Sequence, residues 1–190
     1  MLYLKKEDCP LKGEYQCMKK LRKLLSSCIL VVCFVAVLSV NVYAAVLGEF
    51  STKFNEHNHP RVTNLKLASS AIDSKTLAPG EVFSYNTAVG PTTAARGYQK
   101  SKIIVKGKEK EGFGGGVCQI SSTSFNAAKN AGLEIIERHP HSKEVVYIEK
   151  GKDAATSYGG IDLKFKNTMP YPVTISSVIE GNTILVKIIN

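Results

Sequence analysis

Cys118 is the residue of this 190-residue chain whose neighbours best suit it to nucleophilic chemistry. It follows three consecutive glycines at 114–116 and precedes apolar positions spaced roughly as on one face of a helix. A cysteine on the first turn of a helix is favoured as the thiolate, because unpaired N–H groups and the helix dipole stabilise negative charge there. The sequence therefore predicts a glycine turn that delivers Cys118 to a helix start. The alternative is a small buried thiol that only packs.

Two histidines downstream can supply the imidazole that a thiol enzyme needs. Asp153 or Asp162 follows them and can orient the ring. We favour His141 over His139, because His139 precedes a proline that confines it to an extended backbone. The predicted catalytic set is Cys118, His141, His139, Asp153 and Gln119, with the Cys118 backbone N–H and the Gln119 side chain as oxyanion donors.

A binding module is an equally open hypothesis, in which Cys118 only packs. The glycine run and the Gly-, Pro- and Thr-rich loop 87–97 would then cradle a cell-wall glycan or peptide. The residues assigned to substrate binding are Gly114, Gly115, Gly116, Tyr85, Tyr98 and Tyr158. This hypothesis predicts that Cys118→Ser is silent.

Zinc binding is the third hypothesis, because thiolate and imidazole are the usual ligands of zinc. Cys118, His139 and His141 would be the ligands, with His57 or His59 as a fourth. The pair at 57 and 59 supplies too few ligands to specify a site by itself. We therefore assign no metal and no cofactor.

The first 44 residues are typical of a targeting segment. A basic cluster at 19–23 precedes an almost wholly apolar run at 24–42, and Val42-Tyr43-Ala44 offers small residues where a signal peptidase cleaves. The apolar run is also close to the length that spans a bilayer. We predict a cytoplasmic tail plus signal peptide or membrane anchor at 1–44 and an exported domain at 45–190. That domain would be secreted or anchored on the extracytoplasmic face.

Charge and cysteine content agree with this division. Residues 45–190 carry 18 Lys and Arg against 13 Asp and Glu, a net +5 of the +9 of the whole chain. This moderately basic surface suits anionic wall polymers or lipid headgroups, and no nucleic-acid motif accompanies it. Four of the five cysteines precede residue 45, so Cys118 has no partner for a disulfide within the exported part.

The periodicities predict an α+β fold with a mostly antiparallel sheet around the glycine turn and the cysteine helix. One further short helix is expected near 64–73 with Asn64 as its N-cap. Strands are expected at 81–86, and at 134–138 and 145–148 on either side of the histidines. A hairpin of residues 173–179 and 184–189 closes the domain.

Nine segments in order resemble the VanW family: GEFSTKF (48–54), RVTN (61–64), PGEVFSYN (79–86), VG (89–90), RGY (96–98), GGGVCQISST (114–123), ERHPHS (137–142), GKDA (151–154) and DLKFKN (162–167). The resemblance covers nearly all of residues 48–170. It implies an extracytoplasmic setting and a cell-wall context, and it implies no established mechanism.

The function expected first is therefore that of a peptidoglycan- or cell-wall-associated accessory or binding domain, whose partner is a wall peptide or glycan. A thiol-dependent enzyme of the transglutaminase or papain type, acting on cell-wall peptides, and a zinc-binding domain are the alternatives. Catalysis is left open at this point.

Overall fold

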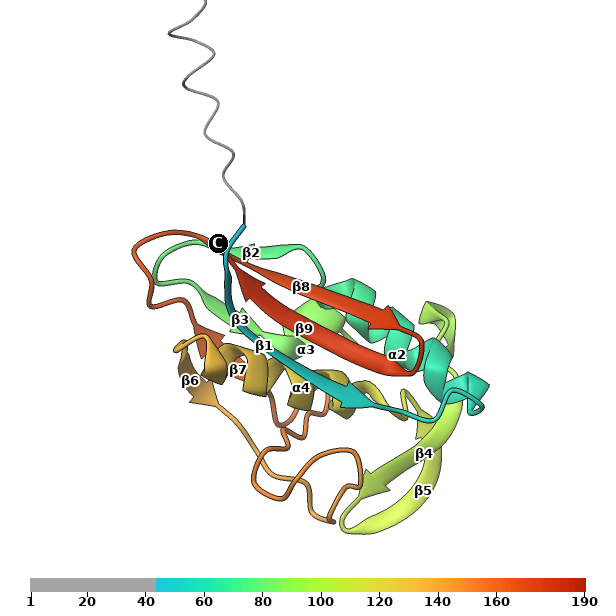
Figure 1. Cartoon of the computed structure of the whole chain (residues 1–190). Coiled ribbons are helices and arrows are strands. Elements are labelled where there is room, and N and C mark those ends of the chain that lie inside the picture. The colour runs from blue at the N-terminus through green and yellow to red at the C-terminus, as the bar shows by residue number, and fades with distance from the viewer. Residues whose placement is uncertain (1–43) are drawn as a thin grey trace, which may run out of the picture. The chain divides into compact units, whose positions relative to one another are not determined.

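Alternating apolar and polar residues build the main sheet. In the computed structural model, which describes residues 44–190, β8 (Val173–Glu180) and β9 (Thr183–Ile189) form an antiparallel hairpin. β1 (Val46–Lys53) pairs with β9 and β2 (Lys75–Leu77) pairs with β8, giving the strand order β1-β9-β8-β2 (Figure 1). The predicted C-terminal hairpin is confirmed.

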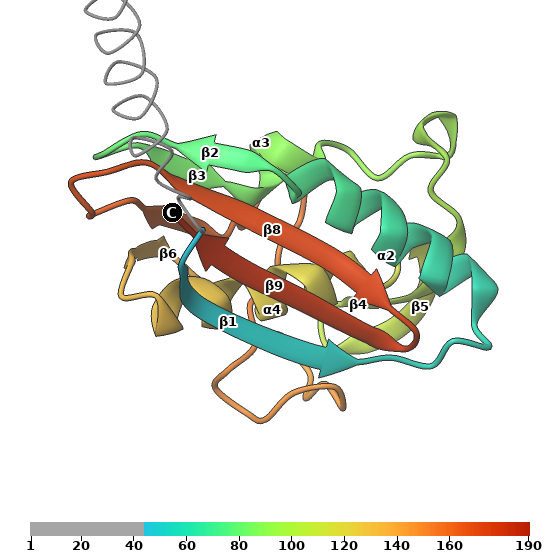
Figure 2. The same ribbon diagram turned by 45° about the horizontal axis from the view of Figure 1, so that its top comes forward.

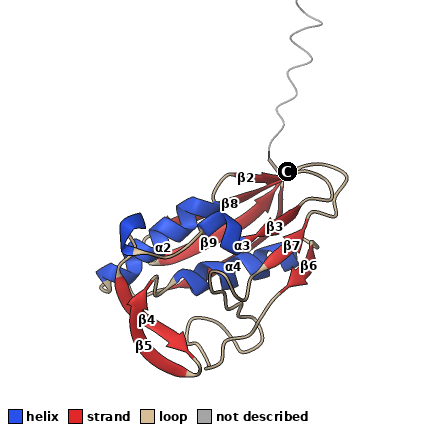
Figure 3. Ribbon diagram, turned by 180° about the vertical axis from the view of Figure 1, so that it is seen from behind, coloured by secondary structure: helices blue, strands red, loops and turns tan. Residues whose placement is uncertain are grey.

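Two helices cover one face of this sheet (Figure 3). α2 (His59–Ile72) packs on β8, and α4 (Val117–Asn130) packs on β1 and β9. Alternate residues of β8 and β9 point into this interface, and Leu65 and Ile120 meet them from the two helices. The fully buried residues here include Ile175, Ile184, Val186 and Ile188. This apolar layer fixes the position of α4, and therefore of the cysteine at its start.

Smaller antiparallel units complete the fold (Figure 2). A three-stranded sheet has the order β3 (Val82–Ser84), β7 (Lys164–Lys166), β6 (Glu134–Glu137). A separate hairpin consists of β4 (Lys100–Val105) and β5 (Lys108–Phe113). The connection from β3 to β4 contains the short helix α3 (Tyr85–Val89) and the 3₁₀ turn η1 (Ala94–Arg96). All strand pairings among residues 44–190 are antiparallel, which confirms the predicted α+β class with mostly antiparallel sheets.

The helix predicted from Asn64 starts earlier than expected. α2 begins at His59, because the side chain of Asn58 accepts from the N–H of Arg61 and Pro60 needs no hydrogen bond in the first turn. Asn64 is instead a fully buried residue of the helix interior. The predicted N-cap was therefore wrong by six residues.

Two predicted strands are also corrected. The segment expected to be extended at 81–86 ends as helix α3, because Ser84 caps the N–H of Thr87. The segment 145–148 forms loop and bends, and Val146 there is fully exposed. The chain therefore carries a long loop after β6 where a second strand was predicted.

The predicted signal or anchor segment, residues 1–44, lies outside the described residues apart from Ala44. Within the part that the structure describes, no helix has the length and apolar character needed to cross a bilayer.

Candidate active site

Cys118 is the second residue of α4, directly after the glycine turn. Gly114 and Gly116 have φ of 81° and 115°, which a residue with a side chain adopts only under strain. The backbone N–H groups of Val117 and Gln119 donate to the carbonyl oxygens of Gly114 and Gly116. Among the described residues nothing accepts from the N–H of Cys118, so this donor is left at the positive end of the helix.

Gly115 brings the turn against strand β4. A Cβ atom at Gly115 would lie 2.6 Å from the carbonyl oxygen of Lys102 and 2.8 Å from the Cβ of Ser101. The carbonyl oxygen of Gly115 accepts from the Asn64 side chain at 3.0 Å, and the same amide group donates to the carbonyl oxygen of Gln99 at 2.9 Å. Asn64 thus joins α2 to Gln99, the residue that precedes β4, and to the glycine turn, which explains its burial.

His141 and Asp153 form a tightly bonded pair beside the thiol. The Nδ1 of His141 lies 2.6 Å from Oδ2 of Asp153, and the same oxygen accepts from the His141 backbone N–H at 2.6 Å. Both side chains are about nine-tenths buried, with 8% and 10% of their surface exposed. The carboxylate engages Nδ1, which leaves Nε2 of His141 for the pocket that Cys118 also lines, and the charges of the two groups act on each other.

The Asp153 carboxylate is itself held from two sides. The guanidinium of Arg138 donates to Oδ1 of Asp153 at 2.8 Å and to its backbone carbonyl at 2.6 Å. Ser122 of α4 accepts from the N–H of Ala154 at 2.9 Å, and the Asn126 amide donates to the carbonyl of Lys152 at 2.6 Å. The polar side of α4 therefore anchors the loop that carries the acid.

The surroundings of Cys118 and His141 shift the pKa of both side chains. Burial of Cys118 opposes the thiolate, but the nearby His141 imidazole and the bonds to Thr156 outweigh it, so the thiol pKa lies below its ordinary value. Burial likewise opposes the charged form of His141, but Cys118 and then Asp153 raise its pKa above the ordinary value. Both shifts favour a thiolate–imidazolium pair.

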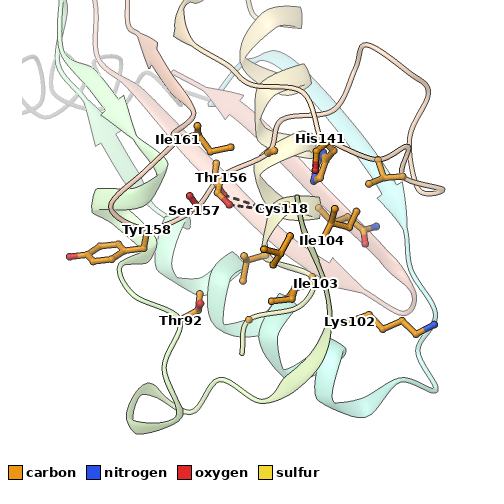
Figure 4. A pocket seen from close by; sticks show the side chains of 18 of the residues that line it. Thr92, Lys102, Ile103, Ile104, Cys118, His141, Thr156, Ser157, Tyr158 and Ile161 are labelled. Carbon is orange, nitrogen blue, oxygen red and sulfur yellow. Dashed lines mark hydrogen bonds between the residues drawn. The ribbon is translucent and has the colours of Figure 1, made fainter. Parts of the chain in front are cut away.

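A pocket of about 580 Å³ opens in front of these groups (Figure 4). One wall is the β4 segment Ile103–Val105, and the opposite wall is formed by the loop residues 155–158. The Cys118 sulfur lies 3.4 Å from the carbonyl oxygen of Thr156 and 3.8 Å from its hydroxyl. Cys118 is partly exposed and lines the pocket.

The other histidine lies outside this cluster. The Nε2 of His139 is 3.0 Å from Glu137, and 41% of the His139 side chain is exposed. Asp162, the alternative acid, accepts from the Ser84 hydroxyl at 2.6 Å and from the N–H of Asn86 at 2.8 Å, where it holds the start of α3. The structure therefore brings Cys118, His141 and Asp153 together, and leaves His139 and Asp162 apart.

Gln119 has a different role from the predicted oxyanion donor. Its amide nitrogen donates to the Thr52 hydroxyl at 3.2 Å and to the carbonyl oxygen of Lys53 at 2.8 Å. Its amide oxygen accepts from Arg61 at 2.9 Å. Both amide hydrogens are thus directed to β1, and the side chain is 1% exposed.

Two of the three predicted contact tyrosines belong to the core. Tyr85 is 1% exposed and donates its hydroxyl hydrogen to the carbonyl oxygen of Val117 at 2.7 Å, and Tyr98 is 4% exposed. They cannot form a ligand contact surface, which corrects that prediction. Tyr158 is 62% exposed and lines the pocket. Of the predicted glycines, Gly114 and Gly116 line the pocket, and Gly115 packs behind it.

Sequence reasoning missed Arg61, Tyr147 and Thr156, which all line the pocket. The Tyr147 hydroxyl is 3.5 Å from Nε2 of His141 and 3.4 Å from the Ser122 hydroxyl. Burial, and next the nearby Cys118, raise the pKa of Tyr147, so this group stays a neutral hydroxyl beside the imidazole. Arg61 belongs to the segment RVTN, which resembles the VanW family but carries no sequence signal for a binding site.

The predicted zinc ligands do not gather at one place. Within residues 44–190 no three His, Cys, Asp or Glu side chains are arranged to hold a metal ion. His139 is paired with Glu137, and His57 and His59 are exposed around the start of α2.

Comparison with known proteins matches most of this chain to one family. The family model described as VanW like protein matches residues 60–189. The "Uncharacterized protein YoaR" of Bacillus subtilis (strain 168) is 42% identical over 142 residues, which is 75% of this chain and 47% of that protein. The "Vancomycin B-type resistance protein VanW" of Enterococcus faecalis (strain ATCC 700802 / V583) is 32% identical over 151 residues, which is 66% of this chain and 54% of that protein. The chain spans about half the length of both relatives, and no solved structure matches it.

Proposed function

The chain belongs to the family of VanW-like proteins, and from this premise and the geometry of its pocket we propose that it is a thiol-dependent acyl-transfer enzyme of the cell envelope. The observation that carries the proposal is the buried Asp153–His141 pair, whose imidazole lines the same pocket as Cys118 and lies close enough to shift the pKa of its thiol. A buried acid that orients an imidazole beside a thiol at a helix start is the arrangement that nucleophilic catalysis by cysteine needs.

The first half of the reaction forms a thioester. The Cys118 thiolate attacks the carbonyl carbon of a peptide bond, and the carbonyl oxygen takes up the negative charge. The N–H of Cys118, at the positive end of α4, is placed to donate to this oxyanion. As the C–N bond breaks, the His141 imidazolium gives its proton to the departing amine, and Asp153 keeps the ring oriented.

The second half releases the acyl group. Neutral His141 takes a proton from water or from an acceptor amine, which attacks the thioester carbon. The S–C bond breaks, and the thiolate–imidazolium pair is restored. The acceptor decides whether the enzyme acts as a hydrolase or a transpeptidase.

The substrate class follows from the setting. A wall peptide is the proposed substrate, since one relative carries the name of a vancomycin resistance protein and the segment before residue 45 has the pattern of an export signal. Export places the domain on the extracytoplasmic face, where wall peptides are found.

Intact-protein mass spectrometry tests the proposal. The full chain in detergent is incubated with soluble peptides released from peptidoglycan, and a covalent acyl adduct is sought. We expect an adduct on wild type. Cys118→Ala should form none. A native thiol that iodoacetamide modifies only after unfolding would show that Cys118 is a packing residue, and the proposal would be abandoned.

Binding without catalysis is the second candidate function. A further pocket of about 500 Å³ adjoins the first and shares Arg61, Ile103 and Tyr147 with it, so the two form one continuous surface on which a peptide or glycan could bind. A binding domain predicts that Cys118→Ser leaves affinity for soluble wall fragments unchanged and that no acyl adduct forms in wild type.

A further inference from the structure

Arg61 lies between the two pockets and lines both of them. It is in the first turn of α2, where a positive charge is opposed by the helix dipole, and that turn contains no acidic residue. The charge of Arg61 therefore gains no stabilisation from the helix dipole or from a first-turn acid.

The guanidinium has few partners inside the protein. Among the three arginines of the described residues, Arg138 is paired with the Asp153 carboxylate, and Arg96 donates to the carbonyl oxygens of Val89 and Pro91. Arg61 donates from one nitrogen to the amide oxygen of Gln119 at 2.9 Å. No described carboxylate lies within ion-pair distance of it, so most of its five N–H donors remain available.

The surroundings hold this cation in place without neutralising it. Gln119 is fixed on β1 by its own two hydrogen bonds, and its oxygen orients the guanidinium. The other cation that lines both pockets, Lys102, is 80% exposed and pairs with Glu109. Burial lowers the pKa of Arg61, although Tyr147 and Cys118 act against this, which is consistent with a poorly solvated charge.

We propose that Arg61 binds a carboxylate of the substrate and thereby selects peptides that present a free carboxyl group close to the bond attacked by Cys118. A planar guanidinium held at one nitrogen offers its remaining edge as a fork that matches two carboxylate oxygens. The proposal rests on the proposed function for its account of the reacting bond. Gln119 is then a positioning residue for Arg61.

Direct binding tests the carboxylate site without any reaction. N-acetylglycine, its neutral counterpart N-acetylglycinamide and inorganic phosphate serve as probes of the full chain in detergent, with saturation-transfer NMR as the readout. N-acetylglycine should bind at least about tenfold more tightly than the amide, as expected for charge-assisted hydrogen bonds. Equal binding of the amide, or tighter binding of phosphate, overturns the assignment. This comparison needs no variant, so it stands even if a substituted chain fails to fold.

Two variants locate the effect. Arg61→Gln should remove the preference for N-acetylglycine over the amide. Lys66→Gln removes one exposed positive charge from the same helix and should retain the preference. Loss of the preference in both variants, or in neither, contradicts a specific role of Arg61.

Alkylation of Cys118 separates this inference from the proposed function. Iodoacetate and iodoacetamide react alike: the thiolate forms an S–C bond to the methylene carbon, the C–I bond breaks and iodide leaves. The ratio of their rates on one variant at one pH cancels the fraction of thiolate present. Relative to wild type, Arg61→Gln should lower the iodoacetate-to-iodoacetamide ratio about tenfold, and Lys66→Gln by less than about twofold. A native thiol inert to iodoacetamide refutes the thiol enzyme, whereas a reactive thiol with an unchanged ratio refutes the carboxylate site.

Discussion

His139 and His141 lie two residues apart, and each has a ring nitrogen within 3.0 Å of a carboxylate oxygen. Their surroundings differ. The His139–Glu137 pair is partly exposed and is shared with Lys164 at 2.8 Å, whereas the His141–Asp153 pair is buried and adjoins a thiol. An imidazole–carboxylate contact is therefore no evidence of catalysis by itself. Burial and a thiol in the same pocket distinguish the candidate site from a surface ion pair.

The two histidine–carboxylate pairs should differ most in the effect of a histidine-to-alanine substitution on the rate of acyl-adduct formation. His141→Ala removes the proposed acid and base and should slow acyl-adduct formation on Cys118 by about a hundredfold or more. His139→Ala should change the rate by less than about twofold. Time-resolved intact-protein mass spectrometry with one wall-peptide preparation measures both. Equal effects would show that the two histidines do not differ in the way proposed here.

The two carboxylates should differ in their contribution to stability. Asp153→Asn leaves the partly buried Arg138 without its charged partner, and the loss should be somewhat smaller than the cost of breaking a fully buried pair, which is about 3 to 5 kcal/mol. Glu137→Gln weakens a pair that water already screens, which is worth under about 1 kcal/mol. Urea unfolding at pH 7, followed by circular dichroism, gives both free energies. A loss below about 1 kcal/mol for Asp153→Asn would mean that the pair is not tightly held.

The sequence predicts much of the difference between His141 and His139, because the features that indicate it lie close together in the chain. The glycine run marked Cys118, the proline between the histidines favoured His141, and chain order supplied Asp153 as one of two acids. The C-terminal hairpin also followed from alternation and the Gly181-Asn182 turn.

The remaining site residues depend on contacts between distant segments. Arg61 meets Gln119 across 58 residues, and Asn64 meets Gly115 across 51, which no periodicity encodes. Tyr85 and Tyr98 were misassigned because tyrosine suits both a core with a bonded hydroxyl and a ligand surface. Tyr147 was missed because residues 145–148 were predicted as a strand, whereas the structure makes them part of a loop that lines the pocket.

The ionisation of Cys118 offers a finer test of the same comparison. The thiol pKa lies below its ordinary value mainly because His141 outweighs the effect of burial. The rate of iodoacetamide alkylation should therefore rise with pH through an inflection below the value of an ordinary cysteine. His141→Ala leaves burial unopposed by an imidazole, so its inflection should move upward by about one unit or more. His139→Ala should retain the wild-type inflection, and a shift of equal size there would contradict the assignment.

The smallest expected effect concerns Glu137 in acid. Lys164 most strongly, then the N–H of Asp162 and His139, lower the Glu137 pKa to about 2, from an ordinary 4.5. A carboxyl whose pKa is lower in the folded chain contributes stability above its unfolded pKa and loses it as the pH falls through the folded one. Wild type should therefore lose more stability than Glu137→Gln between pH 4.5 and 2, by a margin under about 1 kcal/mol because the pair is partly exposed. Thermal unfolding of both proteins across this interval measures the margin. An equal loss of stability in both proteins would show that Glu137 gains nothing from its partners. The His139–Glu137 pair would then not stabilise the fold.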